Sequence, residues 1–200
     1  MKKIILLFLV VNTTIIFSQT PCSGGNANGF PCNGITLQGH LSISEMGGQS
    51  YGSNDPAEAQ DSWGWTDPDT GKEYALVGMN DQTAFVDISD PNNPVYLGKL
   101  DSRTSTSWWR DVKTYDHYAY IVSDDNGRHG VQIFDLHRLR GLDGSSVENF
   151  SEDGNFGRNS IRSAHNIIIN EETGYAYILG SNSINSGGPT ILDLNNNPTN

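Results

Sequence analysis

The strongest constraint on the fold is a phrase that occurs three times along the chain. Each copy has a strand beginning Tyr-Ala, then a polar turn, then a second strand that ends in Asp followed by Ile or Leu. The opening strands span residues 74–78, 118–122 and 175–180, and the closing strands span 84–88, 131–136 and 190–194. The closing Asp falls at 87, 135 and 193, which gives spacings of 48 and 58 residues. Recurrence at this period predicts stacked supersecondary units of similar construction.

Each unit also has a short strand that precedes the Tyr-Ala strand. These strands are predicted at 63–66, 111–115 and 166–170, and turn-forming residues such as 67–71 and 171–174 bound them. Helical periodicity is weak throughout, and only residues 136–142 suggest a single helical turn. The chain is therefore predicted to be all-β.

Several short antiparallel strands per unit, repeated at ~40 to 50 residues, are typical of β-propeller blades. A β-sandwich is the alternative, but it does not require the same phrase to recur. We therefore predict an incomplete β-propeller of about three blades. Because a propeller needs about four or more blades to close, we expect the chain to be truncated at its C-terminus. The remainder of the propeller, or a partner chain, would then be needed to close the fold.

The N-terminus has the pattern of an export signal. Lys2 and Lys3 precede an apolar run at 4–11, and a small residue, Ser18, marks the expected cleavage site. The apolar run is too short to span a membrane. We expect a signal peptide at 1–18, an N-terminal segment at 19–60 and a partial propeller at 61–200, in a protein that acts in the extracellular space or at the cell surface.

The charge balance argues against nucleic acid as a partner. The formal net charge is −11, and the 12 basic residues are scattered rather than clustered. Proteins that bind phosphate backbones concentrate Lys and Arg on one surface. An acidic chain is compatible with an extracellular location, and its carboxylates offer ligands to Ca²⁺.

The two cysteines, Cys22 and Cys32, flank a loop rich in Gly and Asn. In an exported chain such a pair predicts one disulfide bond. The alternative is half of a zinc site, but the further Cys or His ligands of a closed site are not found nearby in the sequence.

Five longer phrases resemble one known family. They are WGWTDP at 63–68, GKEYALVG at 71–78, FVDISDP at 85–91, WRDVK at 109–113 and AHNIIIN at 164–170. With these phrases the chain resembles the choice-of-anchor B proteins with LVIVD repeats, a family of bacterial exported proteins. The resemblance implies a secreted or surface-held β-propeller, whose relatives differ mainly in a C-terminal anchoring device. We expect no such device in the sequence up to Asn200. The family brings no established enzymatic reaction to these positions.

The main site candidates are polar residues at the start of the strands that precede each Tyr-Ala strand, called the inner strands below. Arg110 and Asp111 begin the second inner strand, and His165 and Asn166 begin the third. Because the first strand of each blade lines the channel of a propeller, these side chains would converge on a ligand. Asp111, His165 and Asn166 are also weak candidates for a metal site, with Ca²⁺ as the ion. The alternative is structural, in which Asp and Asn satisfy backbone groups at strand ends.

The remaining polar candidates are expected to be structural. The recurring Asp87, Asp135 and Asp193 are predicted to accept hydrogen bonds from the amides of the following turn. His117 and His129 lie beside turns and are predicted to be on the surface.

The four tryptophans supply the second kind of site. Trp63 and Trp108, with Trp65 and Trp109, are candidates for an aromatic surface that binds sugar rings or a protein. We expect at least two of the four to pack inside the fold instead.

These patterns together predict a non-enzymatic, exported binding or scaffold module without a cofactor. Its expected ligand is an extracellular protein or glycan. The alternative is a metal-assisted hydrolase with its site at the mouth of the propeller channel. No catalytic residue is assigned, because the sequence contains no recognisable catalytic motif.

Overall fold

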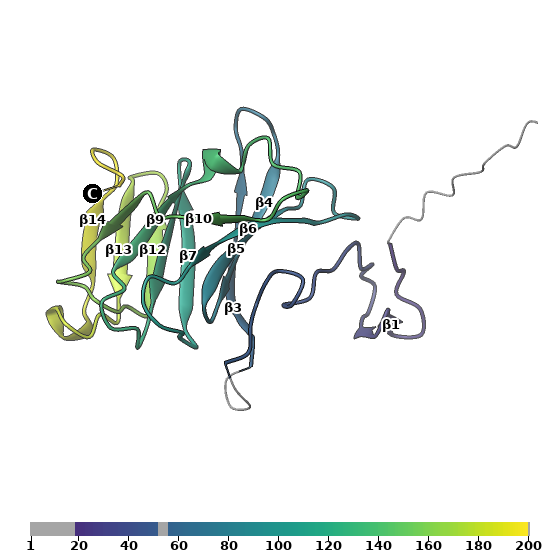
Figure 1. Ribbon diagram of the computed structural model, residues 1–200, viewed down its shortest axis with the longest axis horizontal. Helices are drawn as coiled ribbons and strands as arrows, with labels where there is room; N and C mark the ends of the chain where they lie inside the picture. The colour runs from purple at the N-terminus through teal and green to yellow at the C-terminus, as the bar shows by residue number, and fades with distance from the viewer. Residues whose placement is uncertain (1–18, 52–55, 200) are drawn as a thin grey trace, which may run out of the picture. The chain divides into compact units, whose positions relative to one another are not determined.

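The computed structural model describes residues 19–51 and 56–199 (Figure 1). The predicted signal peptide at 1–18 lies outside these residues. Within the described part, the fold is all-β, and the only helical elements are two short 3₁₀ turns. The chain divides into two compact units, one up to Gly39 and one from His40 onwards. We describe each by itself.

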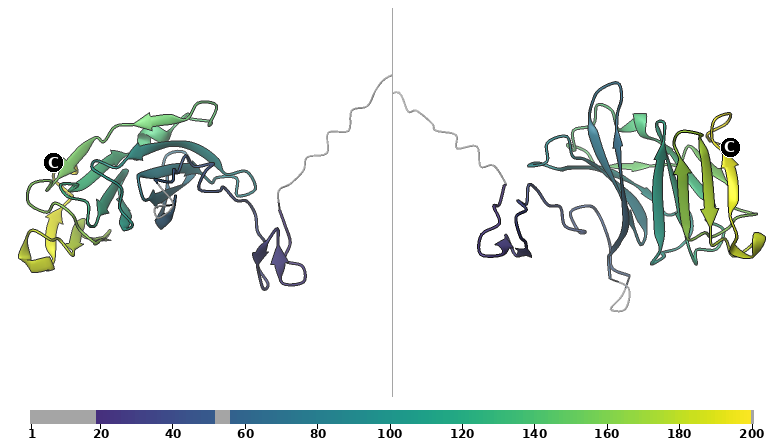
Figure 2. Two further views of the ribbon diagram at one scale, coloured as in Figure 1. Left: turned by 60° about the horizontal axis from the view of Figure 1, so that its bottom comes forward. Right: turned by 180° about the vertical axis from the view of Figure 1, so that it is seen from behind.

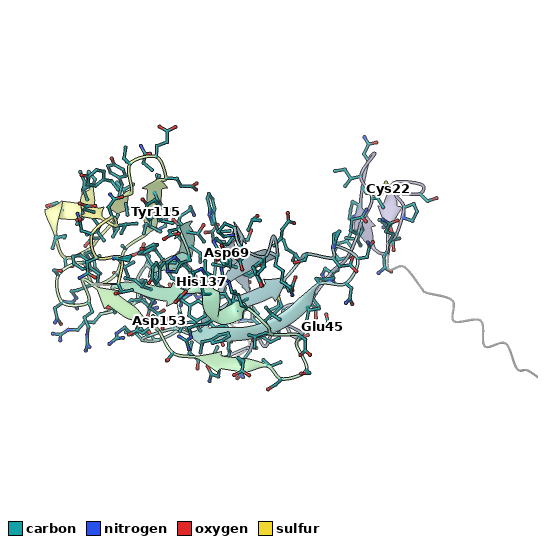
Figure 3. The ribbon with its side chains drawn as sticks, turned by 90° about the horizontal axis from the view of Figure 1, so that it is seen from above. Cys22, Glu45, Asp69, Tyr115, His137 and Asp153 are labelled. Atoms are coloured by element: carbon teal, nitrogen blue, oxygen red, sulfur yellow. A yellow bond between two sulfur atoms is a disulfide. The ribbon has the colours of Figure 1, made fainter. Side chains whose placement is uncertain are left out.

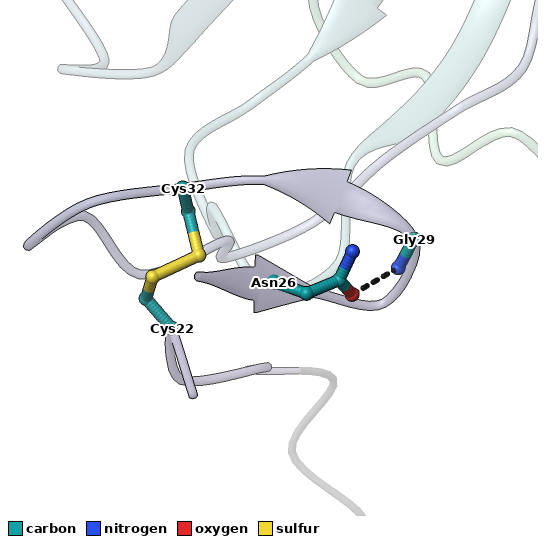
Figure 4. The surroundings of a disulfide bond; sticks show 4 residues. All are labelled: Cys22, Asn26, Gly29 and Cys32. Carbon is teal, nitrogen blue, oxygen red and sulfur yellow. Dashed lines mark hydrogen bonds between the residues drawn. A yellow bond between two sulfur atoms is a disulfide. The ribbon is translucent and has the colours of Figure 1, made fainter. Parts of the chain in front are cut away.

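The first unit is held together by the predicted disulfide. Cys22 and Cys32 are bonded to each other and flank a small hairpin of β1 (Asn26–Ala27) and β2 (Phe30–Pro31). Within its turn, the Gly29 N–H donates to the Asn26 side-chain oxygen at 2.8 Å (Figure 4). Because the disulfide consumes both thiols, neither cysteine is left to bind zinc.

The second unit contains three open sheets, which lie side by side (Figure 2). Sheet 1 has the order β10-β6-β5-β4-β3. Its strands are β3 (Ala59–Thr66), β4 (Glu73–Met79), β5 (Gln82–Asp87), β6 (Val95–Asp101) and β10 (Glu148–Phe150). All of its pairs are antiparallel except β10 with β6. A side chain at Gly98 in β6 would collide with the Glu148 carbonyl oxygen, so glycine is required for β10 to pair there.

Sheets 2 and 3 are built in the same way. Sheet 2 has the order β11-β9-β8-β7, with β7 (Arg110–Tyr115), β8 (Tyr118–Ser123), β9 (Val131–Asp135) and β11 (Gly154–Phe156). Sheet 3 has the order β12-β13-β14, with β12 (Asn166–Asn170), β13 (Tyr175–Leu179) and β14 (Thr190–Asp193). The 3₁₀ turns are η1 (Leu136–Leu139), where a single helical turn was predicted, and η2 (Asn185–Gly187).

The recurring aspartates occupy one position in the register of the three sheets. Asp87 pairs with Tyr74, Asp135 with Tyr118, and Asp193 with Tyr175. Each Asp side chain accepts a hydrogen bond from the backbone N–H two residues further on, at 2.9, 2.9 and 3.0 Å respectively. This turn geometry is the structural role that the sequence predicts for them.

Two apolar interfaces form the core of the second unit. The first lies between sheets 1 and 2, where the rings of Phe85 and Phe134 stack with their centroids 4.5 Å apart. The Arg140 guanidinium crosses this interface and donates to both oxygens of the buried Asp67 carboxylate, at 2.7 and 2.6 Å. The second interface lies between sheets 2 and 3. Each sheet is therefore stabilised by burying one face against the next.

Residues 40–48 cover the other face of sheet 1. Leu41, Ile43 and Met46 pack against apolar side chains of sheet 1, including Ala84 and Val86. The segment is also tied down by a hydrogen bond from the Gln82 side-chain amide to the Met46 carbonyl, at 2.8 Å. No helix in the described part of the chain has the length and apolar character needed to cross a membrane.

Candidate functional site

The inner strands β3, β7 and β12 of the three sheets are neighbours, since β7 contacts both of the others. Their register places Asp61 opposite Gly78, Asp111 opposite Val122 and Asn166 opposite Leu179. The three polar residues therefore occupy equivalent positions in successive sheets. The sequence pattern indicates Asp111 and Asn166 but not Asp61, because the equivalence of Asp61 becomes visible only in the strand register.

These positions link each sheet to the next. The Asp61 carboxylate accepts a hydrogen bond from the Val112 N–H in β7 at 2.9 Å. In the same way, the Asp111 carboxylate accepts from the Ile167 N–H in β12 at 2.8 Å. Such a carboxylate satisfies an inner-strand amide that the sheet leaves without a partner. Asn166 stands at the third equivalent position, and its amide donates to Asp111 at 3.3 Å.

Lys113 forms ion pairs with both of these carboxylates. Its ammonium group lies 3.3 Å from an oxygen of Asp61 and also forms an ion pair with Asp111. Burial, together with the neighbouring Asp61 carboxylate, raises the pKa of Asp111. Both oxygens of Asp111 thus have partners within the fold.

A small cavity of about 190 Å³ collects most of the predicted polar candidates. It is lined by Gln60, Asp61, Trp109, Arg110, Asp111, His165 and Asn166. His165 is half exposed and pairs through Nδ1 with the Asp124 carboxylate at 2.8 Å. The structure therefore brings Arg110, Asp111, His165 and Asn166 together around one small cavity.

The Arg110 side chain, however, is buried, and its guanidinium forms hydrogen bonds inside the fold. Its Nε donates to the Met79 carbonyl oxygen at 2.8 Å, and its Nη1 lies 3.1 Å from Nε2 of His129. His129 is fully buried, so the prediction that it lies on the surface was wrong. Because an arginine can only donate, His129 accepts at Nε2, and its Nδ1–H donates to the Gly130 carbonyl at 2.9 Å. Burial, reinforced by the Arg110 charge, lowers the pKa of His129 to about 3.

An open groove of about 880 Å³ lies along β3 and β7. Its walls include Trp63, Trp65, Tyr115, Asp116 and Glu171. The Trp63 side chain is 38% exposed, its indole N–H donates to the Thr114 hydroxyl at 3.1 Å, and the Lys113 ammonium lies 4.6 Å from its ring centroid. Trp65 is buried, and its indole N–H donates to the Asp116 carbonyl at 2.9 Å. The groove therefore contains one exposed indole, that of Trp63, whose orientation is fixed by its N–H hydrogen bond and which has polar groups around it.

The exposed tryptophans do not line the same cavity. Trp63 lines the groove and Trp109 lines the small cavity, whereas Trp108 lines neither of the two. Of the four, only Trp65 is buried, so the expectation that at least two pack inside was wrong. Tyr115 and Glu171, which the sequence analysis did not select, complete the groove together with Trp63.

Comparison with known proteins returned no match to any family model, to any curated protein or to any solved structure.

Proposed function

We propose that this chain is an exported, non-enzymatic binding module built on an incomplete β-propeller, with a glycan of the extracellular space as the first ligand class and an extracellular protein as the second. The groove along β3 and β7 carries the proposal. Sugar rings stack on exposed indoles and form hydrogen bonds with carboxylates and hydroxyls. Trp63, Asp116 and Glu171 supply these groups in one groove.

Three features support the propeller architecture. The sheets are open antiparallel arrays with a common register, their inner strands are adjacent, and equivalent carboxylates link each sheet to the next. These are the relationships expected between consecutive blades. The sequence phrases that resemble the choice-of-anchor B proteins with LVIVD repeats point to the same architecture and to export, and the disulfide suits an oxidising compartment.

The exposed face of sheet 3 supports the view that further blades complete the assembly. Residues opposite each other in the register form three equivalent pairs: Leu76 with Phe85, Tyr120 with Ile133, and Tyr177 with Ile191. The first pair is buried under sheet 2 and the second under sheet 3. In the third pair, Ile191 is 59% exposed. We propose that the rest of a longer chain, or a partner chain, covers this face.

A metal-assisted hydrolase is the weaker proposal. It requires Asp111 to offer a free carboxylate to a cation, but that carboxylate holds the Ile167 amide and the Lys113 ammonium. The ammonium also places a positive charge where the cation would bind. The small cavity is thus better explained as part of the contact between sheets than as a catalytic centre.

The groove predicts that one exposed indole controls glycan binding. We expect the chain to bind at least one member of a panel of cellohexaose, xylohexaose, laminarihexaose and chitohexaose. Replacing Trp63 by Ala should weaken that binding at least tenfold, because the stacking surface is lost. Isothermal titration calorimetry measures the effect.

Trp109→Ala is the matched control, since Trp109 is also an exposed indole but lies outside the groove. It should leave the affinity unchanged. If all four hexaoses fail to bind, or if Trp63→Ala binds as tightly as the wild type, the glycan proposal is wrong. The protein-ligand alternative would then be next to be tested.

The uncovered face of sheet 3 predicts self-association of the isolated chain. Ile168, Tyr177 and Ile191 lie in one cross-strand row, and exposed apolar rows on sheets promote association. We expect Ile191→Lys to increase the monomer fraction several-fold in size-exclusion chromatography with light scattering. Val147→Lys is the control, because Val147 is similarly exposed but lies outside sheet 3. A monomeric wild type, or an equal response to both substitutions, would contradict the prediction.

A further inference from the structure

Two histidines and one aspartate form a cluster that the proposed function does not use. They are His117 in the turn between β7 and β8, Asp135 at the end of β9, and His137 in η1. Figure 3 labels His137. Each offers one ligand atom, and these atoms all lie within 4.8 Å of one another. All three residues are partly buried.

Strand pairing, one backbone hydrogen bond and one side-chain hydrogen bond hold the three residues together. Asp135 pairs with Tyr118, the residue that follows His117. The Leu136 N–H donates to the His117 carbonyl at 2.8 Å, and the His137 N–H donates to the Asp135 carboxylate at 2.9 Å. The backbone positions of the three residues are therefore fixed by secondary structure, so only their side chains need to move when a ligand binds.

The two imidazole rings must turn to reach one ion. The rings of His117 and His137 stack with an interplanar angle of 6° and centroids 4.1 Å apart. Because the nitrogen lone pairs lie in the ring planes, at least one ring has to rotate about its side-chain bonds before both face a common ion. Nδ1 of His117 lies 2.9 Å from the Asp116 carboxylate. When Nδ1–H donates to this carboxylate, the lone pair of Nε2 is left for a ligand. A carboxylate behind a histidine in this way is the usual support of metal-binding imidazoles.

We propose that His117, Asp135 and His137 bind one divalent late transition-metal ion of the Zn²⁺ class. Two imidazole nitrogens and one carboxylate oxygen form a donor set that suits Zn²⁺ and its neighbours and is unlike the all-oxygen set preferred by Ca²⁺. Ligand atoms around tetrahedral zinc are about 3.3 Å apart, whereas these atoms lie within 4.8 Å of one another, so side-chain rotation is needed to close the site. Three protein ligands leave a fourth position for water or for another ligand.

The site lies beside the groove. Asp116, which supports His117, lines the groove, and the buried Trp65 of the groove wall has its ring centroid 6.1 Å from that of His137. The metal proposal nevertheless stands independently of glycan binding. Both cysteines are in the disulfide, so they offer no thiolate that would compete for the ion.

Calorimetric titration of the 200-residue chain, without a polyhistidine tag, with Zn²⁺ alone tests the proposal. We expect one saturable equivalent in the wild type. His117→Gln and His137→Gln should each weaken binding at least tenfold, and Asp116→Asn should weaken it by about tenfold through loss of the supporting carboxylate. Circular dichroism would show that the variants remain folded.

His165→Gln is the matched control. His165 also pairs with a carboxylate, that of Asp124, but lies outside the cluster, so this variant should bind Zn²⁺ as the wild type does. The proposal is overturned if the wild type shows no saturable binding, if both cluster variants retain its affinity, or if His165→Gln loses affinity as they do.

Discussion

Lowering the pH from 6.5 to 3 is expected to remove about 4 kcal/mol from the free energy of unfolding through His129 alone. The pKa of this buried imidazole is lowered to about 3 in the folded chain, whereas an unfolded histidine titrates near 6.5. Between these values the unfolded chain binds a proton that the folded chain does not. Stability is therefore present above pH 6.5 and is lost as the pH falls, at up to about 1.4 kcal/mol per pH unit.

His129→Gln isolates this contribution. A glutamine retains an acceptor for Arg110 and a donor for the Gly130 carbonyl, but it does not titrate. Urea unfolding followed by tryptophan fluorescence should show a steep loss of stability between pH 6.5 and 4.5 in the wild type and a much flatter dependence in the variant. Hydrogen bonds from Arg140 lower the pKa of Asp67, so that its stabilisation is lost only below about pH 4, outside this window. Equal slopes in the two proteins would show that His129 is not the responsible group.

Replacing Phe134 by Ala is expected to destabilise the chain by about 3 to 5 kcal/mol. The Phe134 ring is fully buried between sheets 1 and 2, where it stacks on Phe85 and contacts Phe150 at a centroid distance of 4.9 Å. Its removal leaves a cavity among side chains from two sheets, which cannot collapse without moving both. The midpoint of urea unfolding measures the loss.

The control is Ile191→Ala on the uncovered face of sheet 3. Because Ile191 is exposed, this substitution should change the free energy of unfolding by less than about 0.5 kcal/mol. If Phe134→Ala costs no more than the control, the contact between sheets 1 and 2 does not supply the stability assigned to it.

The sequence predicts those parts of the fold that depend on local chemistry. The strands with β-branched and aromatic runs, the single turn in η1 and the disulfide were all predicted, and so was the role of Asp87, Asp135 and Asp193. Each depends on residues close together in the chain. The phrase that recurs in the sequence, from Tyr-Ala to the closing Asp, corresponds to the same Tyr–Asp pairing in all three sheets.

Features that depend on distant residues were not predicted. β10 pairs with β6 across about 50 residues, and strands of three residues have too few positions to show a period. The sequence around His129 is a glycine-rich turn, and its buried partner Arg110 lies 19 residues earlier. The groove likewise combines β3 with β7, so Tyr115 and Glu171 carry no local sign that they share it with Trp63.

Residues 40–48 make the two ends of the row of sheets different, because they cover the outer face of sheet 1. Sheet 3 has an uncovered face onto which another sheet can be added, whereas the outer face of sheet 1 is occupied by Leu41, Ile43 and Met46. A second molecule cannot place its sheet 3 there while this segment is bound, so head-to-tail polymerisation into filaments is blocked at that end.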